Sequence, residues 1–120
     1  MSSIEDIGAA EYCYLTTTGR RTGRPHRIEI WFVGHDDAAY LLAGSRASDW
    51  YRNLEVNPAA ALEIAGERRT TVARPVDDDD PSNDAVRRAM VEKYQPGYGE
   101  DLPAWSRDSA LGRVEWSPEG

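Results

Sequence analysis

The segment from residue 12 to residue 33 constrains the fold of this chain more than any other feature. Tyr12–Thr18 and His26–Val33 are rich in aromatic and β-branched residues, and the short turn Gly19–Pro25 joins them. Strands joined by so short a connection pair in the antiparallel direction. In the second run, side chains alternate between two faces, with one set at Ile28, Ile30 and Phe32 and the other at Arg27, Glu29, Trp31 and Val33. The sequence therefore predicts a β-hairpin near the start of the domain.

The turn of this hairpin is strongly basic in an otherwise acidic chain. Residues 12–28 contain four arginines and no acidic residue, although the formal net charge of the 120-residue chain is -7. Glycines and small hydroxyl side chains in the turn allow close approach of a ligand, and guanidinium groups match phosphate or carboxylate geometry. The alternative is a solvated hairpin tip whose arginines pair with surplus carboxylates. We expect an anion site formed by Arg20, Arg21, Thr22, Gly23 and Arg27.

The rest of the chain divides into short elements separated by turn residues. We expect a short helix within residues 1–10, strands at 38–43, 59–65, 68–76 and 113–116, and helices at about 49–56 and 83–94. Residues 95–112 are predicted to be irregular and to cover a pocket. About six strands and two or three short helices indicate one α+β domain over residues 1–120, built on a small antiparallel barrel-like sheet.

Composition excludes several classes of protein and of site. The single cysteine, Cys13, permits no internal disulfide and no cysteine-based zinc site, and we expect it to be a packed strand residue. A pI near 4.8 argues against nucleic-acid binding. The acidic run Asp77–Asp80 lacks the spacing of a calcium loop, so no metal site is expected. The absence of a long apolar run and of a charged-then-apolar leader predicts a cytoplasmic protein with no integral membrane segment.

A second group of residues could hold a planar anionic ring. Ser45 and Arg46 follow a strand, and Trp50 lies one helical turn beyond them. A backbone break, a cation and a large aromatic side chain together can hold a heteroaromatic ligand. His26 is placed to line the same site, whereas no pattern for nucleophilic catalysis is present. The aromatic side chains that could cover the pocket, or simply pack over the barrel, are Tyr94, Tyr98 and Trp105.

Two motifs together resemble a known family. The first is Leu-Thr-Thr-Thr-Gly-Arg-Arg-Thr-Gly at residues 15–23, followed by Pro-His-Arg at 25–27, and the second is Trp-Tyr-Arg-Asn-Leu-Glu-Val-Asn-Pro at 50–58. They resemble the deazaflavin (coenzyme F420)-dependent nitroreductase and quinone reductase family. The resemblance covers nearly the whole chain from Tyr12 and implies a split β-barrel related to the flavin-binding, pyridoxamine-phosphate-oxidase-like fold. It also implies hydride transfer from reduced coenzyme F420 to a quinone, enone or nitroaromatic acceptor.

The resemblance assigns roles by position. Coenzyme F420 is a deazaflavin with a phosphate and a polyglutamate tail, and these anionic groups would contact Arg20, Arg21, Thr22 and Gly23, with Arg27 beside them. Ser45 and Arg46 would approach the ring, and Trp50 would pack against it. The substrate side of the pocket, with candidate catalytic groups, would be lined by Tyr94 and Tyr98. The family often has lysine where this chain has Arg21, and proline near the position of Glu29.

Two alternatives remain open from the sequence. One is a protein of the same fold that binds or carries a flavin, deazaflavin or haem-type ligand without turnover. The other is an FMN-dependent reductase, although one phosphate needs fewer arginines than this chain offers. The expected partner is a small-molecule acceptor. A homodimer is also expected, and the outward-facing Trp31 could either serve that contact, line the pocket or lie on the barrel exterior under a helix.

Overall fold

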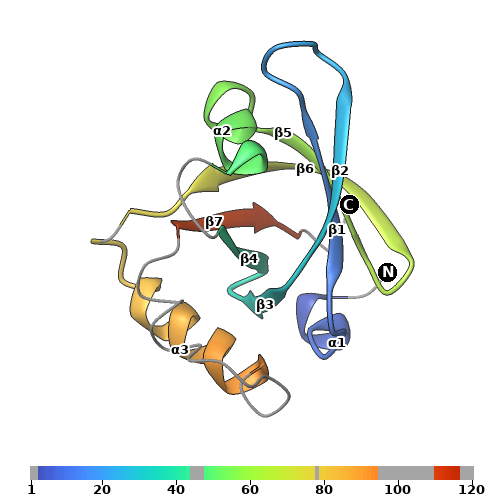
Figure 1. Ribbon diagram of the computed structural model, residues 1–120. Helices are drawn as coiled ribbons and strands as arrows, with labels where there is room; N and C mark the ends of the chain where they lie inside the picture. The colour runs from blue at the N-terminus through green and yellow to red at the C-terminus, as the bar shows by residue number, and fades with distance from the viewer. Residues whose placement is uncertain (1–2, 44–47, 78, 95–109, 117–120) are drawn as a thin grey trace.

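The structure is a computed structural model that describes residues 3–43, 48–77, 79–94 and 110–116 (Figure 1). Within these ranges, seven strands form one antiparallel sheet in the order β2-β1-β5-β6-β7-β4-β3. The strands are β1 (Cys13–Thr18), β2 (Pro25–Ile30), β3 (Phe32–His35), β4 (Ala38–Ala43), β5 (Ala59–Ile64), β6 (Glu67–Pro75) and β7 (Ala110–Glu115). The helices are α1 (Ile4–Ile7), α2 (Asp49–Val56) and α3 (Asn83–Tyr94).

The sheet curls into a barrel because its two edge strands are consecutive in sequence. β2 and β3 stand at opposite ends of the strand order, yet only Trp31 separates them. One residue spans at most about 3.6 Å, so the two edges of the sheet must meet there. Figure 1 shows the resulting curvature around a shared interior. The predicted antiparallel barrel is confirmed, but the expected single strand His26–Val33 is two strands, which raises the count from six to seven.

The alternation predicted for that run is confirmed by the packing. Ile28, Ile30 and Phe32 pack with the cluster inside the barrel, whereas Trp31 and Val33 pack with a second cluster under α3. The strand changes its pairing partner at Trp31, from β1 to β4, without changing which side chains face inward. Periodicity within one run therefore predicts the faces, but it carries no information about which strand lies alongside.

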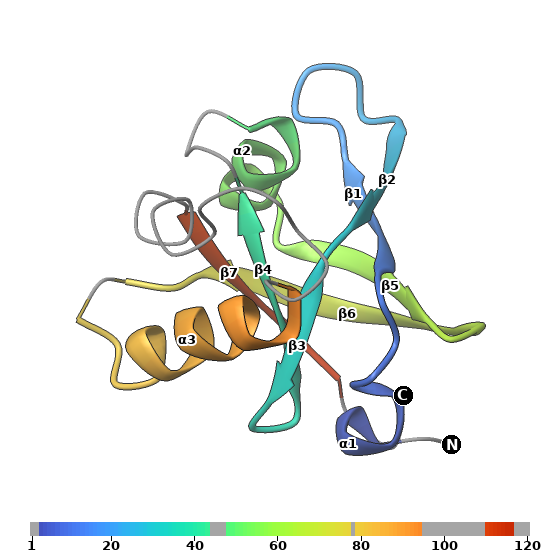
Figure 2. The same cartoon turned by 60° about the horizontal axis from the view of Figure 1, so that its bottom comes forward.

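β4 is buried on both faces and separates the two clusters. One face contributes Leu41 to the barrel interior, and the other contributes Tyr40 and Leu42 to the layer beneath α3. Val86 and Met90 extend from α3 into that layer, as their spacing in the sequence predicts. Figure 2 shows α3 lying against the outer side of β3 and β4. The Ala-Ala-Tyr-Leu-Leu-Ala sequence of β4 is apolar throughout because neither of its faces meets water.

Three element boundaries differ from expectation or depend on local caps. α1 begins with a capping box between Ser3 and Asp6 and ends at Ile7, within the range of residues 1–10 that was expected to hold a short helix. The hairpin of β5 and β6 turns at Ala65 and Gly66, whose φ angles of 52° and 85° suit a tight antiparallel connection. β7 begins at Ala110, so the last residues of the segment predicted to be irregular, 110–112, belong to a strand instead.

No helix in the described part is long and apolar enough to cross a membrane.

Lys93 ties the end of α3 to the barrel. Its ammonium donates to the carbonyl oxygens of Gly8 at 3.0 Å and Phe32 at 2.8 Å and lies 3.9 Å from the centre of the Phe32 ring. Burial is the main cause that lowers the pKa of Lys93 from 10.5 to about 8. The folded chain therefore releases this proton at a lower pH than the unfolded chain does.

A pH-dependent contribution to stability follows from this shift. Between about pH 8 and pH 10.5 the unfolded chain binds more protons at Lys93 than the folded chain, so this group makes unfolding less favourable as pH rises. As pH rises through this range, we expect the unfolding free energy of wild type to increase relative to that of Lys93→Met. Urea titrations of both proteins at several pH values measure it. Parallel pH profiles for the two proteins would contradict the lowered pKa.

Candidate anion-binding site

The loop between β1 and β2 is closed by its own backbone. The amide of Gly19 donates to the carbonyl of Arg24 at 2.8 Å, and the amide of Gly23 donates to the carbonyl of Gly19 at 2.8 Å. The Thr22 hydroxyl accepts from the amide of Arg24 at 3.2 Å. Gly23 has a φ of 73°, which favours glycine, and a Cβ at Gly19 would lie 3.2 Å from the Arg24 carbonyl oxygen. The loop therefore has a defined shape that favours glycine at residue 23, where φ is positive, and at residue 19, where a Cβ would be crowded.

Asn53 fastens this loop to α2. Its Oδ1 accepts from the backbone amide of Arg20 at 3.2 Å and from Nη1 of the same residue at 2.9 Å. Its Nδ2 donates to Oγ1 of Thr17, in β1, at 3.0 Å. The side chain is only 3% exposed, so one buried amide joins the loop, the strand before it and the helix. Figure 1 shows the hairpin loop projecting beside α2, as these bonds require.

Asp49 supplies a second attachment for Arg20. Its backbone carbonyl accepts from Nη1 at 3.4 Å, and its carboxylate lies 3.2 Å from Nη2. The side chain of Arg20 is 18% exposed, whereas that of Asp49 is 69% exposed. Arg20 is thus mainly a structural cation that holds the loop against the start of α2.

A cleft of about 210 Å³ opens between the loop and α2. It brings together four of the predicted residues and three that were not assigned to the site from the sequence, and its lining is Gly19, Arg20, Arg21, Thr22, His26, Asp49 and Asn53. Asn53 could have been found, because it is a polar residue within the buried stripe formed by Trp50, Tyr51 and Leu54 on α2. Nothing in the sequence pattern indicated the contact of Asp49 with Arg20.

The remaining loop arginines add positive charge in and beside the cleft: Arg21 lines it, and Arg24 lies on the same loop outside the lining. Arg21 and Arg24 are both exposed, and in the described ranges neither has an acidic partner within ion-pair distance. Guanidinium groups held on a shaped loop, without competing carboxylates, are suited to phosphate or carboxylate ligands. The arrangement favours an anion site over a solvated tip at Arg21 and Arg24, whereas Arg20 does pair with a carboxylate.

Arg27 lies on the other side of β2. Because neighbouring strand residues face opposite sides, Arg27 points away from the side taken by His26. Its guanidinium lies 4.2 Å from the centre of the Tyr14 ring and 3.5 Å from the Glu63 carboxylate. The structure therefore does not bring Arg27 into the cleft, and its predicted part in the cradle is not supported by its position.

The predicted ring-binding residues are only partly described. Ser45, Arg46 and Tyr98, with Trp105, lie outside the described residues. Trp50 is 6% exposed and packs edge-on against Tyr51, with ring centres 5.7 Å apart. A contact between Trp50 and a bound ring remains a prediction.

Tyr94 joins α3 to the barrel. Its ring stacks on Trp31 with centres 4.2 Å apart, and its hydroxyl contacts the backbone of Phe32 and the carbonyl of Glu11. Burial is the main cause that raises the pKa of Tyr94 to about 12. A catalytic role for Tyr94 remains a prediction, and it would require the hydroxyl to leave these backbone partners. The same stacking places Trp31 under α3, so the expected dimer contact through an outward-facing Trp31 is not supported.

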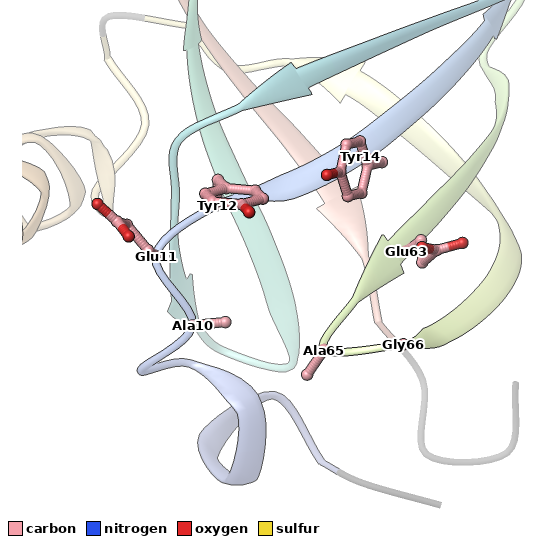
Figure 3. Close-up of a pocket in the computed structure, with 7 residues that line it drawn as sticks. All are labelled: Ala10, Glu11, Tyr12, Tyr14, Glu63, Ala65 and Gly66. Carbon is pink, nitrogen blue, oxygen red and sulfur yellow. The ribbon is translucent and has the colours of Figure 1, made fainter.

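The described residues also line hollows other than the loop cleft. One of about 250 Å³ is lined by Tyr12 and Tyr14 together with Ala10, Glu11, Glu63, Ala65 and Gly66 (Figure 3). Figure 3 shows the carboxylates of Glu11 and Glu63 directed away from the two tyrosine rings. A shallow hollow of about 320 Å³ on the outer face of β1, β5 and β6 includes Gly23. No cluster of three metal-ligating side chains occurs in the part of the chain that the structure describes.

Comparison with known proteins places this geometry in a family. Residues 5–108 match the model of a family described as F420H(2)-dependent quinone reductase. An F420H(2)-dependent quinone reductase of Mycobacterium tuberculosis is 33% identical over 79 residues, which cover 62% of this chain and 52% of that protein. The chain thus spans about half the length of the curated relatives it matches.

Solved structures show the same fold. The heme storage protein HutZ from Vibrio cholerae superimposes with a TM-score of 0.75 at 25% identity, covering 95% of this chain and 87% of that one. An F420-H2 dependent reductase, FDR-A, gives a TM-score of 0.70 at 18% identity, covering 88% and 94% respectively. The predicted split barrel and the resemblance drawn from the two motifs are both confirmed. Because the family model spans residues 5–108 of the 120, this chain belongs to the F420H(2)-dependent quinone reductase family.

Proposed function

We propose that this protein is an oxidoreductase that binds coenzyme F420 and transfers a hydride from its reduced form to a small planar acceptor. The observation that carries the proposal is the shaped loop on which Arg21 and Arg24 stand without acidic partners among the described residues. Family membership supports the same cofactor. The acceptor class that we propose comprises quinones, enones and nitroaromatics.

The residues of the cleft fit the anionic part of this cofactor. A phosphate and several carboxylates are suited to binding by exposed guanidinium donors. Arg21 supplies such a group, and Arg24 stands on the same closed loop. Arg20 holds that loop against α2 through Asn53 and Asp49. We propose that the loop binds the phosphate and tail, while Ser45, Arg46 and Trp50 contact the ring.

When bound, the reduced cofactor supplies the hydride, and the protein contributes binding, orientation and exclusion of water. Burial raises the pKa of Cys13 and of Tyr94 to about 12, so both side chains stay protonated well above neutral pH. Neither residue therefore offers an anionic nucleophile. We propose that Tyr94, Tyr98 or a bound water supplies the proton that accompanies the hydride.

The loop assignment is tested by replacing Arg21 with alanine. Loss of a charge-assisted contact worth about 1.5–3 kcal/mol should weaken F420 binding about 10- to 100-fold. Fluorescence titration of the purified protein with oxidised coenzyme F420 measures the change. Arg88→Ala is the matched control, because Arg88 is exposed on α3 and far in sequence from the loop. Equal affinities of wild type and Arg21→Ala would contradict the proposed anion contact.

Parallel titrations separate this function from its alternatives. Clear binding of FMN with no binding of F420 would assign the protein to FMN chemistry. Saturable F420 binding without reduction of any quinone, enone or nitroaromatic would indicate a cofactor carrier. Binding of F420 with turnover of one acceptor class would support the proposal and identify that class.

A further inference from the structure

The guanidinium of Arg20 has two edges in different surroundings. At Nη1 it donates to neutral acceptors, Oδ1 of Asn53 at 2.9 Å and the carbonyl oxygen of Asp49 at 3.4 Å. At Nη2 it meets the carboxylate of Asp49 at 3.2 Å. The neutral acceptors belong to a buried amide and to helix backbone, so they hold the guanidinium whatever happens at Nη2.

The carboxylate of Asp49 is the exchangeable part of this arrangement. Its side chain is 69% exposed, and exposed ion pairs of this kind contribute little to stability. An external anion could therefore replace it at Nη2 while Asn53 keeps Arg20 in place. The loop would not have to open for this exchange, because the Asn53 bond to the backbone amide of Arg20 is independent of Asp49.

Asp49 is also the one acidic residue among the described residues that line the cleft. The other ionisable groups there are Arg20, Arg21 and His26. A fixed negative charge within a few ångströms opposes an incoming phosphate or carboxylate and neutralises part of the field of Arg20. The Asp49 carboxylate thus occupies the Nη2 donor of Arg20 and also repels an anionic ligand.

We propose that Asp49 is an internal competitor for the anion site, whose carboxylate occupies Arg20 until an anionic group of the ligand displaces it. The proposal deepens the proposed function and rests on it for the identity of the ligand. It assigns Asp49 an effect opposite to that of a simple structural ion pair. Removing the charge should improve anion binding, although an ion pair and an acidic residue in the first turn of α2 are lost.

The test compares Asp49→Asn with Asp84→Asn. Asp84 is exposed in the first turn of α3, so the control makes the same change in net charge in the first turn of another helix, outside the cleft lining. Each protein is titrated with oxidised coenzyme F420 by fluorescence and with inorganic pyrophosphate by calorimetry. We expect Asp49→Asn to bind both probes about three- to tenfold more tightly than wild type at low salt, as a nearby surface charge would cause. The gain should shrink as added salt screens the charge.

The outcomes separate this proposal from the proposed function. If F420 binds no variant but Asp49→Asn binds pyrophosphate more tightly than wild type, the competitor role stands and the proposed cofactor is wrong. Equal or weaker binding of both probes by Asp49→Asn would overturn the competitor role. An equal gain in Asp84→Asn would also overturn it, because net charge alone would then explain the effect. Failure of every variant to bind either probe would remove both the anion site and the competitor.

Discussion

Replacing Asn53 with alanine is expected to lower the free energy of unfolding by about 2–4 kcal/mol. The change removes both bonds to Arg20 and the bond to Thr17 Oγ1, and the Thr17 side chain is 2% exposed. Buried polar groups that lose their partners cost more than the bonds themselves are worth. Urea unfolding of wild type and variant, analysed with a shared slope, measures the loss.

Asn53→Asp is the conservative control for this prediction. A carboxylate at residue 53 retains both acceptor contacts with Arg20, and the hydroxyl of Thr17 can donate to it. Less than half of the loss seen for alanine is therefore expected. A loss within about 0.5 kcal/mol for Asn53→Ala, which is ordinary for a surface site, would contradict the role of Asn53 in joining the loop to α2.

The second large effect is expected at Trp50. Truncation to alanine should lower the free energy of unfolding by about 3–5 kcal/mol, because it removes a large buried ring and leaves a cavity. The ring lies between α2 and β7, and a Cβ added at Gly112 would stand 3.3 Å from it. Calorimetric or urea unfolding measures the change. A loss below about 1 kcal/mol would show that the ring is not part of the core.

Trp50→Phe distinguishes packing from contact with a cofactor ring. Phenylalanine keeps most of the apolar volume, so a loss of about 1–2 kcal/mol in stability is expected. The affinity for F420 is then measured in this folded variant. A decrease of tenfold or more, together with a small loss of stability, would support the predicted stacking of Trp50 on the cofactor. Unchanged affinity would assign Trp50 to the core alone.

Local patterns predicted much of the fold correctly. The hairpin at residues 12–33, the inward faces of Ile28, Ile30 and Phe32, and the apolar stripe of α3 all follow from side-chain periodicity. β7 was partly missed because Ala110–Gly112 has little intrinsic strand preference. It is a strand because it pairs with β4 on one side and with β6 on the other.

The candidate site shows the same division between local and tertiary information. The sequence by itself determined that a glycine-containing, arginine-rich turn follows the first strand, since this depends on neighbouring residues. Only the tertiary structure decided that Asn53 holds Arg20, that Asp49 lines the cleft and that Arg27 points away from it. Arg20 and Asn53 are separated by 33 positions, and their contact forms only when the curled sheet brings the hairpin loop to α2. No pattern of neighbouring residues encodes which cations are paired by such a contact and which remain available to a ligand.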